Sequence, residues 1–223
     1  MRLSVLVSGR GSNLEALLRA IDQGSCPAEV RCVLSDRDDA PALAIAQARG
    51  IATGVVRAKD YADRGAWDAA LAAALSAEQP DLIVLAGFMR IVGPAVLARF
   101  PLRLLNVHPS LLPAFPGKDA PAQAIAKGVA LSGCTVHLVD GGIDTGPILA
   151  QAAVPVLPGD DAALLHARIQ HAEHQLLPAV VAAIARGVLQ LARVGQPGPS
   201  AGAYTPSGPL AAPAAYVWPR LLE

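Results

Sequence analysis

The sequence predicts an α/β protein with a doubly wound, mostly parallel sheet and antiparallel strands added near its C-terminal end. Short apolar runs alternate with stretches whose apolar residues recur at helical spacing, the order expected of consecutive β-α units. The run 82–86 is apolar throughout, as a strand buried on both faces of a parallel sheet should be. After residue 130, two strand-like segments follow each other directly, which favours an antiparallel pair.

The first half of the chain is expected to alternate between strands and helices. Trp67, Leu71 and Leu75 form one helical face, and Gly50 closes the helix that Pro41 opens. The strands are expected at 3–7, 30–34, 51–56, 82–86 and from residue 104. The helices are expected from residue 14 to the glycine at 24, at 41–49, around 67–79 and at about 93–99.

The second half departs from this alternation. A long helix is expected from Asp160 or Asp161 to about Ala185, and Pro178 should kink or divide it. Proline and glycine dominate from residue 195 onward, which predicts a mostly irregular tail after one domain at 1–194. The other expected elements are a helix at 121–127, strands at 134–139 and 147–156, and a short strand at 188–194.

Composition restricts the class of protein before any motif is considered. At 223 residues, 53% of them hydrophobic, the chain suits one α/β domain with an extension. The 18 Lys and Arg balance 18 Asp and Glu, which argues against nonspecific binding to nucleic acid or anionic membranes. No apolar run is long enough for a signal peptide or a membrane span. The scattered Cys26, Cys32 and Cys134 predict small buried thiols in a reduced, cytoplasmic setting.

The segment from Leu104 to Pro113 carries the most specific chemistry. Its apolar residues predict a strand that stops near His108, because Pro109 has no N–H for a central ladder. Asn106 and His108 are two residues apart, so they share a face at the carboxyl end of the strand, where parallel sheets bind ligands. An amide can hydrogen-bond a carbonyl oxygen while an imidazole exchanges a proton near neutral pH. The alternative is that loop backbone satisfies both side chains.

A glycine-rich turn joins the first strand to the first helix. Small residues let the backbone approach a ligand closely, and the helix N-terminus that follows suits a phosphate. The dinucleotide fingerprint needs a third glycine where Leu14 stands, so a phosphomonoester is favoured over a dinucleotide. The alternative is a tight turn capped by Ser12 or Asn13. The turn reads Ser8-Gly9-Arg10-Gly11-Ser12-Asn13.

Two further loops have ligand-binding character. The backbone after the strand 82–86 can hold a flat heterocycle while Arg90 faces an anion, or this is a plain loop with a solvated arginine. In the loop 140–146, three glycines can wrap a ligand, and Asp144 can orient His108 and favour its protonated form. The alternative there is a hairpin loop in which the aspartates make turns.

The remaining histidines do not indicate a metal site, and His137 is interpreted as structural. His137 lies on the strand before the loop 140–146. His166, His171 and His174 lie on the long helix, where no H-x-x-x-H or H-E-x-x-H set is completed by a third ligand. No metal site is therefore predicted.

Together these motifs resemble the phosphoribosylglycinamide formyltransferases, the folate-dependent glycinamide ribonucleotide transformylases of purine synthesis. The similarity runs in order over 3–194. The Asn-x-His-Pro-Ser-Leu-Leu-Pro block with a later Asp is typical of folate-dependent formyltransferases, and the Gly-Ser-Asn loop is the element that selects the phosphoribosyl amine. The resemblance implies a Rossmann-like formyltransferase fold over 1–194 and gives the tail 195–223 no role. It rests on residues 8–13, 86–90, 106–113 and 140–146.

The resemblance also implies the substrates and the residues that meet them. The formyl group would pass from 10-formyltetrahydrofolate, as co-substrate, to the primary amine of glycinamide ribonucleotide. The catalytic residues would be Asn106, His108 and Asp144. The ribonucleotide would be bound by Gly11, Ser12, Asn13, Gln170 and Glu173. The folate would be bound by Arg64, Met89, Arg90, Ile91, Val92, Asn106, Asp140, Gly141, Gly142, Ile143 and Asp144.

The implied mechanism needs neither a metal nor a covalent enzyme intermediate, because the nucleophile belongs to the substrate. The amine attacks the formyl carbon, and Asn106 with protonated His108 stabilises the tetrahedral oxyanion. His108 donates a proton, and Asp144 favours its protonated form and helps to shuttle the proton. The expected partners are small molecules only, with no nucleic acid or membrane, and the chain is expected to be a monomer or homodimer.

Three rival functions fit the sequence less well. Methionyl-tRNA formyltransferase resembles a catalytic domain followed by an RNA-binding barrel, and the segment after Val194 is too short for a barrel. Formyltetrahydrofolate hydrolase carries an N-terminal regulatory domain, whereas this chain opens at its first strand. A non-catalytic sensor of phosphorylated ligands would not need Asn106, His108 and Asp144 together.

Overall fold

The structure, a computed structural model, describes residues 1–191 and 204–206. The chain divides into two compact units, Met1–Asn106 and Val107–Glu223. The hydrogen-bonded strand order of the main sheet is β3-β2-β1-β4-β5-β6-β7. The predicted α/β class, with a mostly parallel sheet and an antiparallel addition, is confirmed.

The first unit is built on parallel strands. β1 pairs with β2 and β4, β2 pairs with β3, and β4 pairs with β5, all in parallel. β4 is buried along its whole length, as its all-apolar sequence requires. The strands are β1 (Arg2–Val7), β2 (Glu29–Ser35), β3 (Ala52–Val55), β4 (Leu82–Leu85) and β5 (Leu104–His108), of which the last continues into the second unit.

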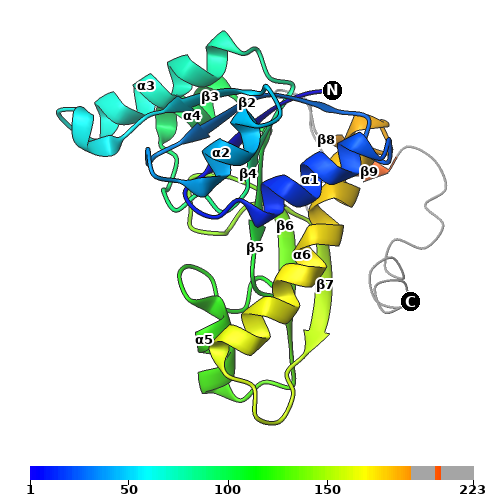
Figure 1. Cartoon of the computed structure of the whole chain (residues 1–223). Coiled ribbons are helices and arrows are strands. Elements are labelled where there is room, and N and C mark those ends of the chain that lie inside the picture. Colours follow the sequence, from blue (N-terminus) through cyan, green and yellow to red (C-terminus); the bar gives the residue numbers. More distant parts are fainter. Residues whose placement is uncertain (192–203, 207–223) are drawn as a thin grey trace. The chain divides into compact units, whose positions relative to one another are not determined.

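Four helices of the first unit match the predicted ones, although α1 and α3 begin two and three residues earlier than expected. α1 packs on α2, and α3 packs on α4. Figure 1 shows α1 and α2 in front of the strands of this unit. Proline opens α2 and α4, and the side chain of Asp63 caps the N-terminus of α3 by accepting from the amide of Ala66. The helices are α1 (Ser12–Asp22), α2 (Pro41–Gln47), the 3₁₀ turn η1 (Ala58–Asp60), α3 (Arg64–Ala77) and α4 (Pro94–Arg99).

The second unit pairs two strands under a long helix. β6 and β7 are antiparallel, and α6 packs against both (Figure 1). α6 is one continuous helix with Pro178 inside it, so the alternative that Pro178 divides it is wrong. The elements are α5 (Ala120–Lys127), β6 (Leu131–Leu138), β7 (Ile148–Pro155), α6 (Ala162–Ala185), β8 (Leu189–Leu191) and β9 (Tyr204–Pro206).

Part of the predicted tail lies outside the described residues, namely 195–203 and 207–223. Within it, β9 pairs antiparallel with β8 in a separate two-stranded sheet. Cys26, Cys32 and Cys134 are buried free thiols, as predicted. In the part of the chain that the structure describes, no helix combines the length and apolar character needed to cross a membrane.

Candidate active site

The glycine-rich turn after β1 leads directly into α1. Gly11 is the N-cap residue, has a φ of 85°, and contributes no side-chain cap. A Cβ at Gly11 would lie 2.7 Å from the Cβ of Ala42, so both backbone conformation and space require glycine there. The helix starts at Ser12, so neither Ser12 nor Asn13 caps it, and that alternative is wrong. What remains is an uncapped helix N-terminus, a geometry that favours an anion.

The loop after β4 carries the predicted folate residues 89–92, and Arg64 contacts this loop. Met89 and Ile91 are 72% and 49% exposed, whereas Val92 is buried. Arg64, at the start of α3, donates from Nη2 to the carbonyl oxygen of Ile91 at 3.3 Å. Arg64 and the segment 89–92 therefore form one surface, with apolar side chains open to a ligand.

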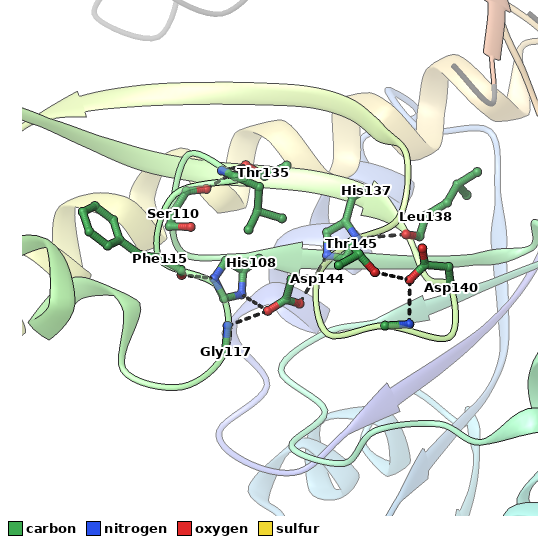
Figure 2. A network of polar contacts seen from close by, with 12 residues as sticks. His108, Ser110, Phe115, Gly117, Thr135, His137, Leu138, Asp140, Asp144 and Thr145 are labelled. Carbon is green, nitrogen blue, oxygen red and sulfur yellow. Dashed lines mark hydrogen bonds and ion pairs between the residues drawn. The ribbon is translucent and has the colours of Figure 1, made fainter. Parts of the chain in front are cut away.

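In the second unit, His108 and Asp144 face each other, as Figure 2 shows. His108 Nδ1 lies 3.3 Å from Asp144 Oδ2. On the other side of the ring, His108 Nε2 lies 2.9 Å from the carbonyl oxygen of Phe115. Both ring nitrogens thus face acceptors, and the ring satisfies both only when each nitrogen carries a proton. His108 itself is only 5% exposed.

Asp144 is surrounded by donors. Its Oδ2 accepts from the backbone N–H of Gly117 at 2.8 Å, and its Oδ1 lies 3.6 Å from His137 Nε2 (Figure 2). Burial acts to raise the pKa of Asp144. The hydrogen bonds from His137 and Gly117, together with the charge of the imidazoles, outweigh it, and the pKa lies below its ordinary value. The carboxylate is therefore held ionised beside two histidines.

The proline-rich loop after β5 is fixed to β6 by Thr135. The Thr135 hydroxyl donates to the carbonyl oxygen of Ser110 at 2.7 Å and accepts from the backbone N–H of Leu112 at 3.0 Å. Gln151 of β7 donates to the carbonyl oxygen of Leu112 at 2.8 Å. This network, partly visible in Figure 2, holds the first part of the loop that carries Phe115, whose carbonyl oxygen lies opposite His108.

The loop 140–146 has a local aspartate turn of its own. Asp140 accepts from the backbone N–H of Gly142 at 3.0 Å and from the hydroxyl of Thr145 at 2.7 Å. Asp144 has a φ of 54°, a left-handed conformation that aspartate tolerates better than most residues. Ile143 is 55% exposed. The aspartate-turn alternative thus holds for Asp140, while Asp144 projects to His108.

The other predicted residues lie on regular elements. Asn106 is half-buried on β5, where it is in register with Leu85 of β4. Gln170 and Glu173 lie on α6, and Glu173 is 4% exposed. Burial raises the pKa of the Cys134 thiol on β6, and the charge of Glu173 adds to this effect. Across residues 1–191 and 204–206, no group of three or more His, Cys, Asp or Glu side chains is arranged to hold a metal ion.

Comparisons with known proteins identify the family. A model described as formyl transferase matches residues 1–181. Phosphoribosylglycinamide formyltransferase of Mycobacterium tuberculosis (strain ATCC 25618 / H37Rv) is 54% identical over 184 residues, which cover 82% of this chain and 85% of the relative. The protein of that name from Escherichia coli (strain K12) is 41% identical over 191 residues, 86% of this chain and 90% of its own length.

Comparison with solved structures identifies the same family. Glycinamide ribonucleotide transformylase 1 from Symbiobacterium toebii superposes with a TM-score of 0.84 at 47% identity, covering 86% of this chain and 90% of the other. The chain therefore belongs to the formyl transferase family. Both relatives named above match over most of each chain and are phosphoribosylglycinamide formyltransferases, as the motifs predicted.

Proposed function

We propose that this enzyme transfers the formyl group of 10-formyltetrahydrofolate to the primary amine of glycinamide ribonucleotide in purine synthesis. The products are formylglycinamide ribonucleotide and tetrahydrofolate. The observation that carries the proposal is the His108–Asp144 pair, which follows Asn106 at the carboxyl end of β5. The proposed domain for this activity is 1–194, followed by the tail 195–223.

The amine of the ribonucleotide attacks the formyl carbon, and a tetrahedral oxyanion forms. The Asn106 amide and the protonated His108 ring donate to that oxygen. The C–N bond between the formyl carbon and the folate nitrogen then breaks. The attacking amine loses a proton, the folate nitrogen gains one, and His108 relays the proton between them. Asp144 holds His108 at Nδ1, which leaves Nε2 as the nitrogen that serves the substrate.

The Phe115 carbonyl has a defined part in this scheme. It accepts from His108 Nε2 at 2.9 Å, so it lies where the oxygen of a substrate would accept from the same nitrogen. The formyl oxygen competes with this carbonyl for the same proton. Because the hydrogen bonds of Thr135 hold the proline-rich loop, they affect whether His108 Nε2 donates to the Phe115 carbonyl or to the formyl oxygen.

The two substrates are assigned to separate groups of residues. The phosphate meets Gly11, Ser12 and Asn13 at the N-terminus of α1, and Gln170 and Glu173 complete the ribonucleotide site. The folate is contacted by Arg64 and 89–92, by Asn106, and by the loop residues Asp140, Gly141, Gly142, Ile143 and Asp144. The enzyme acts on small molecules, as a monomer or homodimer in the cytoplasm, and no step calls for a metal.

A substrate comparison tests the proposal. The purified protein is mixed with 10-formyltetrahydrofolate and either glycinamide ribonucleotide or the same compound without its phosphate. Tetrahydrofolate release is followed by absorbance, and formylation of the amine is followed by mass spectrometry. We expect rapid transfer to the ribonucleotide and very poor transfer to the dephosphorylated form. Equal transfer to both would refute the phosphate site, and transfer to neither would refute the function.

A further inference from the structure

A buried carboxylate outside the predicted site residues joins the two ligand loops of the first unit. Asp36 directly follows β2, and its side chain is 4% exposed. Its Oδ1 accepts from the Ser8 hydroxyl at 2.5 Å, and its Oδ2 accepts from Arg90 Nε at 2.9 Å. Ser8 is the first residue of the glycine-rich turn, and Arg90 lies in the loop after β4, so one carboxylate contacts both.

The Ser8 hydroxyl has only one orientation that satisfies all its neighbours. It accepts from the backbone N–H of Met89 at 2.8 Å, and it has a single proton to give, which goes to Asp36. The Ser8 amide also donates to the carbonyl oxygen of Gly87 at 3.2 Å. Two hydrogen bonds therefore join the turn after β1 to the loop after β4. Asp36 orients the one between the Ser8 hydroxyl and the Met89 amide.

The charge balance favours a positioning role for Asp36. The carboxylate is almost fully buried, while the Arg90 side chain is 49% exposed. A buried carboxylate that loses its cation is costly, so Asp36 anchors Arg90 through Nε and the rest of the guanidinium stays at the surface. The anchored Arg90 and the tethered Met89 are adjacent residues of the surface assigned to the folate.

We propose that Asp36 is a positioning residue that presets both the phosphate turn 8–13 and the folate loop 87–92. The inference rests on the function proposed above for those loops. Because one carboxylate holds both, its loss weakens the binding of both substrates together. A residue that served only one loop would affect only one substrate.

The test uses Asp36→Asn and Ser8→Ala, with Asp39→Asn as the matched control. Asparagine keeps the shape of Asp36 but must turn an NH₂ group toward either the Ser8 hydroxyl or Arg90 Nε. Asp39 follows Asp36 by three residues, and among the described residues its side chain pairs with exposed Arg37 and with no residue of either loop, so the control makes the same chemical change without disturbing these contacts. The measurements are kcat, the KM of each substrate, and hydrogen exchange of the Met89 amide.

Asp36→Asn should raise both KM values by about tenfold or more, the effect of losing a charge-assisted hydrogen bond, while kcat changes far less. Ser8→Ala should speed exchange of the Met89 amide and raise both KM values, and Asp39→Asn should do neither. An increase in one KM alone, or lowered stability with both KM values unchanged, would overturn the proposal. Met89 exchange needs no turnover, so unaltered exchange in Ser8→Ala refutes the tether whatever reaction the enzyme catalyses.

Discussion

At the scale of single residues, the centre of the second unit is a carboxylate between two imidazoles. Asp144 Oδ2 faces His108 Nδ1 and Asp144 Oδ1 faces His137 Nε2, while the far nitrogen of each ring meets a backbone carbonyl oxygen. The carbonyls orient the rings, and the carboxylate binds them from the other side. Each histidine is thus fixed in direction, which a proton donor to a short-lived oxyanion requires.

Replacing His108 by alanine should remove most of the turnover while ribonucleotide binding is retained. Loss of a general acid costs about 10²–10⁴-fold in rate, and the proposed phosphate contacts lie on other elements. Discontinuous assays measure the rate of formyl transfer, and calorimetry measures the affinity for the ribonucleotide. His171→Ala is the control, because His171 is an exposed histidine of α6. Turnover close to that of the control would remove His108 from the mechanism.

Replacing Asp144 by asparagine should lower activity strongly and change how stability depends on pH. The folded protein holds the pKa of Asp144 below its ordinary value of 3.8, so the ionised carboxylate stabilises the fold above that pH. This contribution is lost as the pH falls through the lowered pKa, and asparagine never has it. The difference in unfolding free energy between the two proteins should therefore be constant near neutral pH and shrink in acid.

Urea denaturation of both proteins at several pH values measures this difference. A gap that stays the same from about pH 7 to about pH 3 would show that Asp144 acts by loop geometry alone. His137 offers a second check, since its Nε2 also faces the carboxylate. His137→Gln should give a smaller loss of activity than Asp144→Asn, because His108 and Gly117 still hold the carboxylate.

At the scale of elements, the loop after β4 is held at its far end by α3. Asp68 of α3 is 2% exposed and accepts from the backbone N–H groups of Gly93, Ala95 and Val96 at 2.6, 2.7 and 3.3 Å. These amides belong to the N-terminus of α4, which has no side-chain cap of its own. A carboxylate from one helix therefore caps the next and fixes where the folate loop ends.

Asp68→Ala should destabilise the protein by about 1–3 kcal/mol, because buried amides lose their acceptor. Asp63→Ala is the matched control, since it removes an exposed cap of α3 that accepts from one amide and should cost about 1 kcal/mol. Urea denaturation measures both. The KM for the folate should rise in Asp68→Ala only. Equal losses in the two variants would mean that the Asp68 contacts add nothing beyond an ordinary cap.

Sequence patterns predicted the elements whose signals are local. β4 is buried on both faces and reads as one apolar run, and proline opens α2 and α4. β6 starts at Leu131, earlier than predicted, and the prediction started late because Gly133 interrupts the strand pattern. The structure needs glycine at this position, because a Cβ there would collide with the carbonyl oxygen of Ala152 on β7. α6 continues through Pro178 because packing against β6 and β7 outweighs one lost N–H.

The site was predictable to the extent that it lies at strand ends. Asn106 and His108 stand out because the strand must end at Pro109. The His108–Asp144 contact depends on the left-handed turn at Asp144, and nothing local shows where its carboxylate points. Asp36 was not assigned a functional role because its partners Ser8 and Arg90 lie far away along the chain. Only tertiary structure brings such residues together.

At the scale of the whole molecule, the proposed activity is confined to the part before the tail. Every residue assigned to a substrate lies between Gly11 and Glu173, and the family model ends at residue 181. β8 and β9 form a sheet separate from the seven-stranded one, and β8 packs on α6. Among the described residues, β9 leads to the site through β8 and then α6, which carries Gln170 and Glu173.

Removing residues 195–223 should leave kcat and both KM values unchanged and lower the stability of the second unit slightly. β8 loses its antiparallel partner β9, but it keeps its packing on α6, and a three-residue strand pair contributes little by itself. Steady-state kinetics and thermal unfolding of the 1–194 protein beside the full chain measure both effects. Because β9, the described part of the tail, leads through β8 to α6, which carries Gln170 and Glu173, a tail that contributes to function should raise the KM for the ribonucleotide and spare that for the folate. That selective rise, rather than a fall in stability, would contradict a domain boundary at residue 194.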